Sequence, residues 1–299
     1  MFSEFSDVKL PANYLCEGDF KLILEFFYLN MAKASDPIGI FDSGIGGLTV
    51  ARAVKNVLSN ESIIYFGDTA HLPYGDKSTA AIQAYSIKIC DIFLQRNCKV
   101  ILIACNSASA AATDLVKEYV GKRAKVFNVI EPAVNYIRET YHDSTIGLIG
   151  TKQTVGSGVY ESKINALQNN LRLNSIATPL LVPMIEEGFL QGTISQDIIN
   201  EYLKKPVLQE ISALILGCTH YPLIKDQVSN FYGGKVDIID SSEIVAKSLK
   251  AYLEYNLLAN TSKNPNDHFI VSDFTDSFEE LTKLFFGEQV HLEKFKLWE

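Results

Sequence analysis

Residues 213–223, "ALILGCTHYPL", decide the fold class, because an uninterrupted apolar run ends at a cysteine that polar residues follow. Such a run is typical of a strand that is buried on both faces of a parallel sheet. Cys218 follows the run directly, with a hydroxyl and an imidazole side chain behind it. Residues 100–110, "VILIACNSASA", repeat the arrangement, and there the run ends at Cys105. Two predicted strands that each present a thiol at the tip indicate a pair of related units.

Similar apolar runs alternate with helix-like segments along most of the chain. They are "IGIF" (38–41), "SIIYFGD" (62–68), "KVFNVI" (125–130), "TIGLIG" (145–150) and "KVDIID" (235–240). Segments between them, such as residues 78–97, space their apolar residues as an amphipathic helix does. This alternation predicts an α/β fold with right-handed crossovers. Residues 241–258 are then predicted to be helical, and a strand, a helix and a strand within 268–295 are predicted to return to the first unit.

The pattern also repeats at a matched spacing. Asp42 precedes Cys105 by 63 positions, and Thr151 precedes Cys218 by 67. All four residues are predicted at the carboxyl ends of strands, where open parallel sheets bind ligands. We therefore predict two similar lobes, each a mainly parallel sheet flanked by helices, with the active site in the cleft between them. The predicted domains are residues 37–131 with 241–299, and residues 132–240.

The first 34 residues are expected to form an N-terminal extension. A second start-like stretch begins at Met31, directly before the first clear strand, so residues 1–34 are interpreted as dispensable. The alternative is a short helix over residues 19–29 that docks on the body. The segment has no basic region before its apolar patch and no small-residue cleavage site, so a signal peptide is not predicted.

Charge and cysteine usage exclude several classes of function. The net charge of -8 argues against nucleic acid or an anionic membrane as the main partner, because phosphate binding needs a basic surface. No apolar run approaches the roughly 18 residues that a membrane-spanning helix needs. The five cysteines include no C-x-x-C pair, which favours a reducing, cytoplasmic setting over a disulfide framework.

The two thiols at the strand ends are the main candidates for chemistry. A cysteine beside a helix N-terminus and polar neighbours is easily activated, because the thiolate is the reactive form. A buried structural role is the alternative, and it is accepted for Cys90 and Cys98. Zinc bound by Cys105, Cys218 and His220 is a second alternative, although the usual short ligand spacing is absent.

Polar residues after the strands are candidates for holding a substrate. The turn "FDSGIGGL" matches no phosphate-binding motif and places Asp42 and Ser43 where a cation such as an ammonium group would fit. Backbone donors for a carboxylate are expected in three further turns, although ordinary turns and helix caps are the alternative for each. These turns contain Tyr74 and Gly75, Asn106 and Ser107, and Thr219 and His220.

A pair of carboxylates in "LVPMIEEGF" (181–189) is a candidate partner for the histidine. Either Glu186 or Glu187 could orient the imidazole of His220, and that imidazole could then adjust the ionisation of Cys218. The alternative is a solvated helix start.

Five motifs in order over residues 37–290 resemble the glutamate racemases. They are "GIFDSGIGGLTV", "GDTAHLPYG", "ACNSASA", "VPMIEEGF" and "LGCTHYPL". The resemblance implies cofactor-independent interconversion of L- and D-glutamate, which supplies D-glutamate for bacterial peptidoglycan, by a homodimer with two α/β domains. Ser107 departs from the family, which usually has threonine there.

The resemblance also implies roles for individual residues. Cys105 and Cys218 would be the two acid/base groups, and Asp42, Glu186 and His220 would assist them. Substrate would be held by the pairs Asp42–Ser43, Tyr74–Gly75, Asn106–Ser107 and Thr219–His220. The alternatives are an aspartate racemase, a hydrolase or decarboxylase with a single reactive cysteine, a pyridoxal-phosphate racemase with an essential lysine, and a non-catalytic amino-acid-binding protein.

Overall fold

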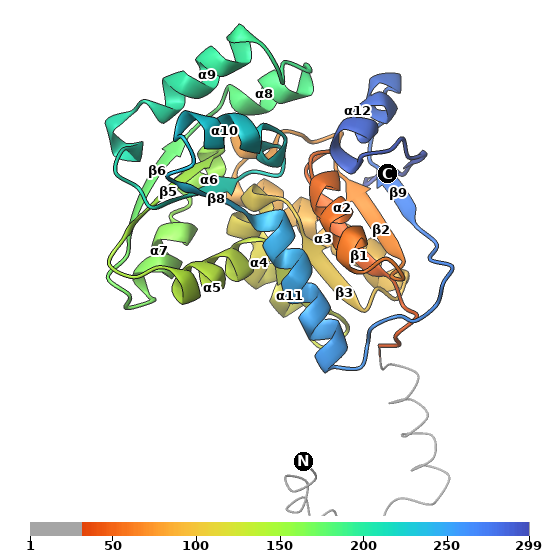
Figure 1. Ribbon diagram of the computed structural model, residues 1–299. Coiled ribbons are helices and arrows are strands. Elements are labelled where there is room, and N and C mark those ends of the chain that lie inside the picture. The colour runs from red at the N-terminus through yellow and green to blue at the C-terminus, as the bar shows by residue number, and fades with distance from the viewer. Residues whose placement is uncertain (1–31, 299) are drawn as a thin grey trace, which may run out of the picture.

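The computed structural model describes residues 32–298 of the 299-residue chain. Residues 1–31 of the extension predicted over residues 1–34, and the whole of the docked helix predicted over 19–29, lie outside the described residues. The described part forms two parallel sheets with helices packed on both faces (Figure 1). The predicted α/β fold with two similar lobes is therefore confirmed.

The first sheet contains six parallel strands in the order β10-β9-β2-β1-β3-β4. Their bounds are β1 (Ile38–Asp42), β2 (Ile63–Gly67), β3 (Val100–Ile103), β4 (Lys125–Asn128), β9 (His268–Val271) and β10 (Leu292–Lys294). Strand β9 pairs with β2, so the C-terminal part of the chain returns to the first lobe as predicted.

The second sheet contains four parallel strands in the order β6-β5-β7-β8. Their bounds are β5 (Thr145–Gly150), β6 (Arg172–Ala177), β7 (Ala213–Gly217) and β8 (Asp237–Asp240). This order matches β2-β1-β3-β4 of the first sheet, so the internal repeat is a repeat of topology. The strands of each sheet fall within the predicted domain ranges, and the domain boundaries themselves stay a prediction.

Helices cover both faces of the sheets. The α-helices are α2 (Leu48–Val57), α3 (Thr79–Gln95), α4 (Asn106–Val120), α5 (Ile130–Thr140), α6 (Lys152–Gly156), α7 (Val159–Asn165), α8 (Leu181–Glu186), α9 (Thr193–Leu203), α10 (Lys225–Phe231), α11 (Ser241–Tyr255) and α12 (Asp276–Phe286). The 3-10 helices are η1 (Tyr74–Asp76), η2 (Pro206–Leu208) and η3 (Tyr221–Ile224). None of the helices in residues 32–298 is long and apolar enough to cross a membrane.

Strands β1, β2, β3 and β7 are almost entirely apolar because they are buried on both faces of their sheets. Along β3, Val100 and Leu102 belong to one core cluster, and Ile101 and Ile103 belong to another on the opposite face. Alternate side chains of a strand point to opposite faces, so a strand that is buried twice needs no polar positions. The first of these clusters runs on into the second lobe, and α11 packs against both α2 and α5. The two lobes therefore share part of one core.

Two sequence predictions of elements need correction, and one strand was missed. The segment 125–130 is not all strand, because the side-chain oxygen of Asn128 accepts hydrogen bonds from the amides of Ile130 and Glu131 and starts α5 there. The helix predicted to reach residue 258 ends at Tyr255, and Leu257 has a left-handed φ of 56°. Strand β6 was not predicted, because this edge strand mixes polar and apolar residues and lacks an apolar run.

Candidate active site

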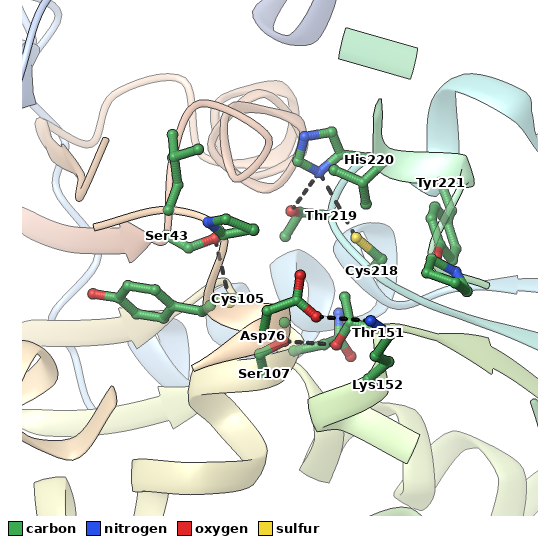
Figure 2. Close-up of a pocket in the computed structure, with 18 of the residues that line it drawn as sticks. Ser43, Asp76, Cys105, Ser107, Thr151, Lys152, Cys218, Thr219, His220 and Tyr221 are labelled. Atoms are coloured by element: carbon green, nitrogen blue, oxygen red, sulfur yellow. Dashed lines mark hydrogen bonds and ion pairs between the residues drawn. The ribbon is translucent and has the colours of Figure 1, made fainter. Parts of the chain in front are cut away.

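A cavity of about 210 Å³ lies beyond the carboxyl ends of strands from both sheets. Cys105, which follows β3, and Cys218, which follows β7, both line it. Their exposed fractions are only 5% and 8%, so each thiol lies in a largely water-excluded wall. Figure 2 shows the two residues on different elements around the same cavity. The structure thus brings together the two thiols that lie 113 positions apart in the sequence.

Cys105 occupies the N-cap position of α4. Its sulfur accepts a hydrogen bond from the Ala108 amide at 3.4 Å and lies 3.8 Å from the hydroxyl oxygen of Ser43. Burial is the largest cause that raises the pKa of the Cys105 thiol to about 12, and the nearby charges of Asp42 and Cys218 also raise it. The two hydrogen bonds lower this pKa, but their effect is weaker. Cys105 is therefore protonated at neutral pH in this structure.

His220 connects Cys218 to a carboxylate. Its Nδ1 lies 3.7 Å from the sulfur of Cys218, and its Nε2 lies 2.9 Å from Oε1 of Glu186. Burial alone would lower the pKa of His220, but the hydrogen bonds and charges of Cys218 and Glu186 outweigh it and raise that pKa to about 10. The imidazole is therefore protonated at neutral pH. Of the two candidate carboxylates, Glu186 makes this contact, while Glu187 is the C-cap of α8.

Asp42 lies behind the cavity wall. Its carboxylate accepts hydrogen bonds from the amides of Gly44 and Gly47 at 3.2 and 3.0 Å, and from the hydroxyl of Thr219 at 3.4 Å. Burial raises the pKa of Asp42, and the positive charge of His220 and the amide bonds oppose that effect. A direct contact between Asp42 and a substrate stays a prediction, whereas its influence on Cys105 and Thr219 follows from these contacts.

The remaining predicted residues also line the cavity, but their polar atoms differ in availability. The Nδ2 group of Asn106 is buried and has no hydrogen-bond partner within the described structure, whereas its Oδ1 accepts from Tyr160. The hydroxyl of Ser107 lies 2.9 Å from that of Thr151. The hydroxyl of Tyr74 donates to Asp68, so this residue presents its backbone rather than its hydroxyl. The free amide of Asn106 and the N-terminus of α4 form a donor set that suits a carboxylate.

Several lining residues were not predicted from the sequence. Thr178 follows the missed strand β6, and its hydroxyl pairs with that of Tyr221 at 2.6 Å. Asp76 and Lys152 form an ion pair of 3.2 Å between the two lobes at the cavity. The repeat of the strand pattern marked Thr151 as a strand-end residue, and Lys152 is its neighbour in the chain. No motif marks Thr178 or Asp76.

A metal site of the kind considered above does not form. Within residues 32–298, no three histidine, cysteine, aspartate or glutamate side chains cluster in a way that could hold a metal ion. Cys105, Cys218 and His220 therefore do not make up the zinc-ligand set that the sequence left open. The four cysteines of this range are free and buried.

Comparison with known proteins agrees with this geometry. A sequence model described as Asp/Glu/Hydantoin racemase matches residues 47–249. The chain is 39% identical over 259 residues to the glutamate racemase of Chlorobaculum parvum, covering 86% of this chain and 95% of the relative. The chain belongs to the Asp/Glu/hydantoin racemase family.

Solved structures point to the glutamate racemases within this family. Glutamate racemase from Francisella tularensis, in complex with D-glutamate, is 40% identical with a TM-score of 0.83, over 88% of this chain and 98% of that one. Glutamate racemase from Thermus thermophilus, in complex with β-chloro-D-alanine, is 35% identical with a TM-score of 0.80, over 89% and 98%.

Proposed function

We propose that this protein is a glutamate racemase that uses Cys105 and Cys218 as its two acid/base groups and needs no cofactor. The supporting observation is that the two thiols come from different lobes and line one cavity. Racemisation removes a proton from one face of the α-carbon and returns one to the other face. Two groups on opposite sides of the carbon can do this without either one moving across it.

The number of protons is conserved in the reaction if one sulfur starts ionised and the other starts protonated. The thiolate takes the α-proton, the electron pair of the broken C–H bond is delocalised into the α-carboxylate, and the second thiol gives its proton to the opposite face. The product then leaves the first sulfur protonated and the second ionised, which is the starting state for the reverse reaction. Thiols suit these roles because moderate changes in environment yield either form near neutral pH.

The surroundings of the two cysteines differ in charge, which supports this assignment. Cys105 lies near the carboxylate of Asp42, and its raised pKa of about 12 keeps it protonated. Cys218 lies beside the imidazole of His220, which can donate a charge-assisted hydrogen bond to its sulfur. Cys105 would therefore be the proton donor of the resting enzyme.

Stabilisation of the carbanion is the harder task, because an amino-acid α-proton is much less acidic than a thiol. The unpaired amide of Asn106 and the first turn of α4 can donate hydrogen bonds to the α-carboxylate as charge develops. These donors are held in place before the reaction, so they need no reorganisation during it. Loss of one such donor costs about 3 kcal/mol, or roughly a hundredfold in rate.

The decisive test is exchange of the α-proton with deuterium, measured with L- and D-glutamate in heavy water. The wild type should exchange and racemise both enantiomers, and Cys105→Ser and Cys218→Ser should each abolish racemisation. Each single variant should retain elimination from a glutamate analogue that carries a leaving group at Cβ, because that reaction needs only one base. Wild-type racemisation by either variant would refute the two-thiol scheme, and faster turnover of L-aspartate than of L-glutamate would make the protein an aspartate racemase.

The wider role proposed for the protein follows from the same resemblance. The enzyme would supply D-glutamate for peptidoglycan in the bacterial cytoplasm and would act as a homodimer. Gel filtration with light scattering tests the dimer, and depletion of the protein with D-glutamate added to the medium tests the role in cell-wall synthesis.

A further inference from the structure

The cavity lining offers little free positive charge to an anionic substrate. Asp76 and Glu186 both line the cavity, and Asp42 lies directly behind its wall. Glutamate brings two carboxylates and one ammonium group, so a cationic side chain at the cavity would favour binding of its distal carboxylate. His220 is already engaged by Glu186 and Cys218. Among the described residues that line the cavity, Lys152 is the only lysine or arginine.

The position of Lys152 suits a contact with a second carboxylate. It is the first residue of α6 and directly follows Thr151, whose hydroxyl lies 2.9 Å from that of Ser107. Its ammonium nitrogen lies 3.2 Å from Oδ1 of Asp76, and Figure 2 shows the two side chains meeting beside the cavity. Both side chains are about three-fifths exposed, at 62% and 61%, so the pair lies at the rim rather than in the wall.

We propose that Lys152 is a specificity-determining residue that binds the distal carboxylate of the substrate after exchanging it for Asp76. This inference rests on the proposed racemisation of glutamate and adds a residue to the binding site. An exposed ion pair contributes little free energy, so the exchange of one carboxylate for another is nearly free of cost. Asp76 holds the ammonium group over the cavity until the substrate replaces it.

The location also determines which kinetic constant depends on Lys152. The ammonium group meets a carboxylate that does not change during proton transfer, so it stabilises the bound substrate and the transition state alike. Loss of such an interaction raises KM and leaves kcat nearly unchanged. Because the group is exposed, its contribution also weakens as salt increases.

The test compares Lys152→Met, Asp76→Asn and Lys163→Met, with glutamate as the substrate. Lys152→Met should raise KM about two- to fivefold with kcat retained, and about 0.5 M sodium chloride should reduce this difference. Asp76→Asn removes the competing carboxylate and should lower KM or leave it unchanged. Lys163→Met is the matched control, because it removes one positive charge from the same lobe at a residue that pairs with Glu131 and does not line the cavity.

The variants distinguish this inference from a purely structural role of the ion pair and from a general effect of positive charge. If the Lys152–Asp76 pair served only to hold the lobes together, both substitutions would change KM and kcat in the same direction, and that result would overturn the inference. An unchanged KM in Lys152→Met, or an equal rise in Lys163→Met, would also overturn it. Failure of the wild type to racemise glutamate would refute the proposed function instead.

Discussion

Nε2 of His220 lies 2.9 Å from Oε1 of Glu186, and this contact joins the N-cap residue of η3 to the last residue of α8. On its other side the same imidazole faces the sulfur of Cys218. The carboxylate thereby orients the ring and favours its charged form. Glu186, His220 and Cys218 thus form a relay of side chains in contact.

The first prediction concerns stability against pH. The pKa of His220 is raised to about 10 in the folded protein from an ordinary value near 6.5, so the folded state holds a proton that the unfolded chain loses earlier. The stabilisation is therefore fully present below pH 6.5 and is lost as the pH rises through about 10. Glu186→Gln should flatten this decline. Urea unfolding at several pH values between 6 and 10 measures it, and equal slopes for the variant and the wild type would contradict the assignment.

The second prediction concerns the ionisation of Cys105. Burial and then the charge of Asp42 are the largest causes of its raised pKa. Asp42→Asn keeps the shape of the side chain and removes that charge, so the pKa of Cys105 should fall and its alkylation by iodoacetamide at pH 9 should become faster. Peptide mass spectrometry in a Cys218→Ser background measures the rate for Cys105 alone. A rate that stays equal to that of Cys218→Ser itself would show that Asp42 does not act on this thiol.

The third prediction concerns the close approach of a glycine to the relay. A Cβ atom at Gly46 would lie 2.3 Å from Cε1 of His220 and 2.8 Å from the hydroxyl oxygen of Thr219, so Gly46→Ala must displace the imidazole. We expect a loss of at least tenfold in kcat, because misplaced catalytic groups cost about a hundredfold per ångström. Gly156→Ala is the control, since no atom lies within 4 Å of its Cβ position, and it should retain activity. Full activity of Gly46→Ala would argue against a fixed imidazole.

The fourth prediction concerns a buried ion pair far from the cavity. Lys99 lies 2.6 Å from Oε2 of Glu61 and also donates to the carbonyl oxygens of Ala34 and Leu258, and both charged side chains are almost fully buried. Lys99→Met leaves the carboxylate without its partner and should lower the free energy of unfolding by about 3–5 kcal/mol.

The double substitution of this pair provides the control. Lys99→Met with Glu61→Leu removes both charges, so it should be less destabilising than Lys99→Met alone. Urea unfolding of the three proteins measures the difference. A double variant that is no more stable than the single one would show that packing, rather than the unpaired charge, determines the loss.

The sequence determined the apolar strands and the residues at their ends. Apolar runs such as 100–103 and 213–216 are local signals, because a strand buried on both faces needs no polar residue along its length. The polar break after each run marks Cys105 and Cys218 as strand-end residues from the pattern alone. The repeated spacing likewise indicated two units of the same topology, which the two sheets confirm.

Only the tertiary structure decided which of these residues meet and on what terms. It selected Glu186 over Glu187 for the contact with His220, put the Asp42 carboxylate behind the wall and paired Asp76 with Lys152 across the lobes. Each of these contacts joins residues of different elements, so it depends on how the sheets and helices pack and has no local signature. The sequence pattern specifies where a strand ends, whereas the packing of the two lobes specifies what its last side chain faces.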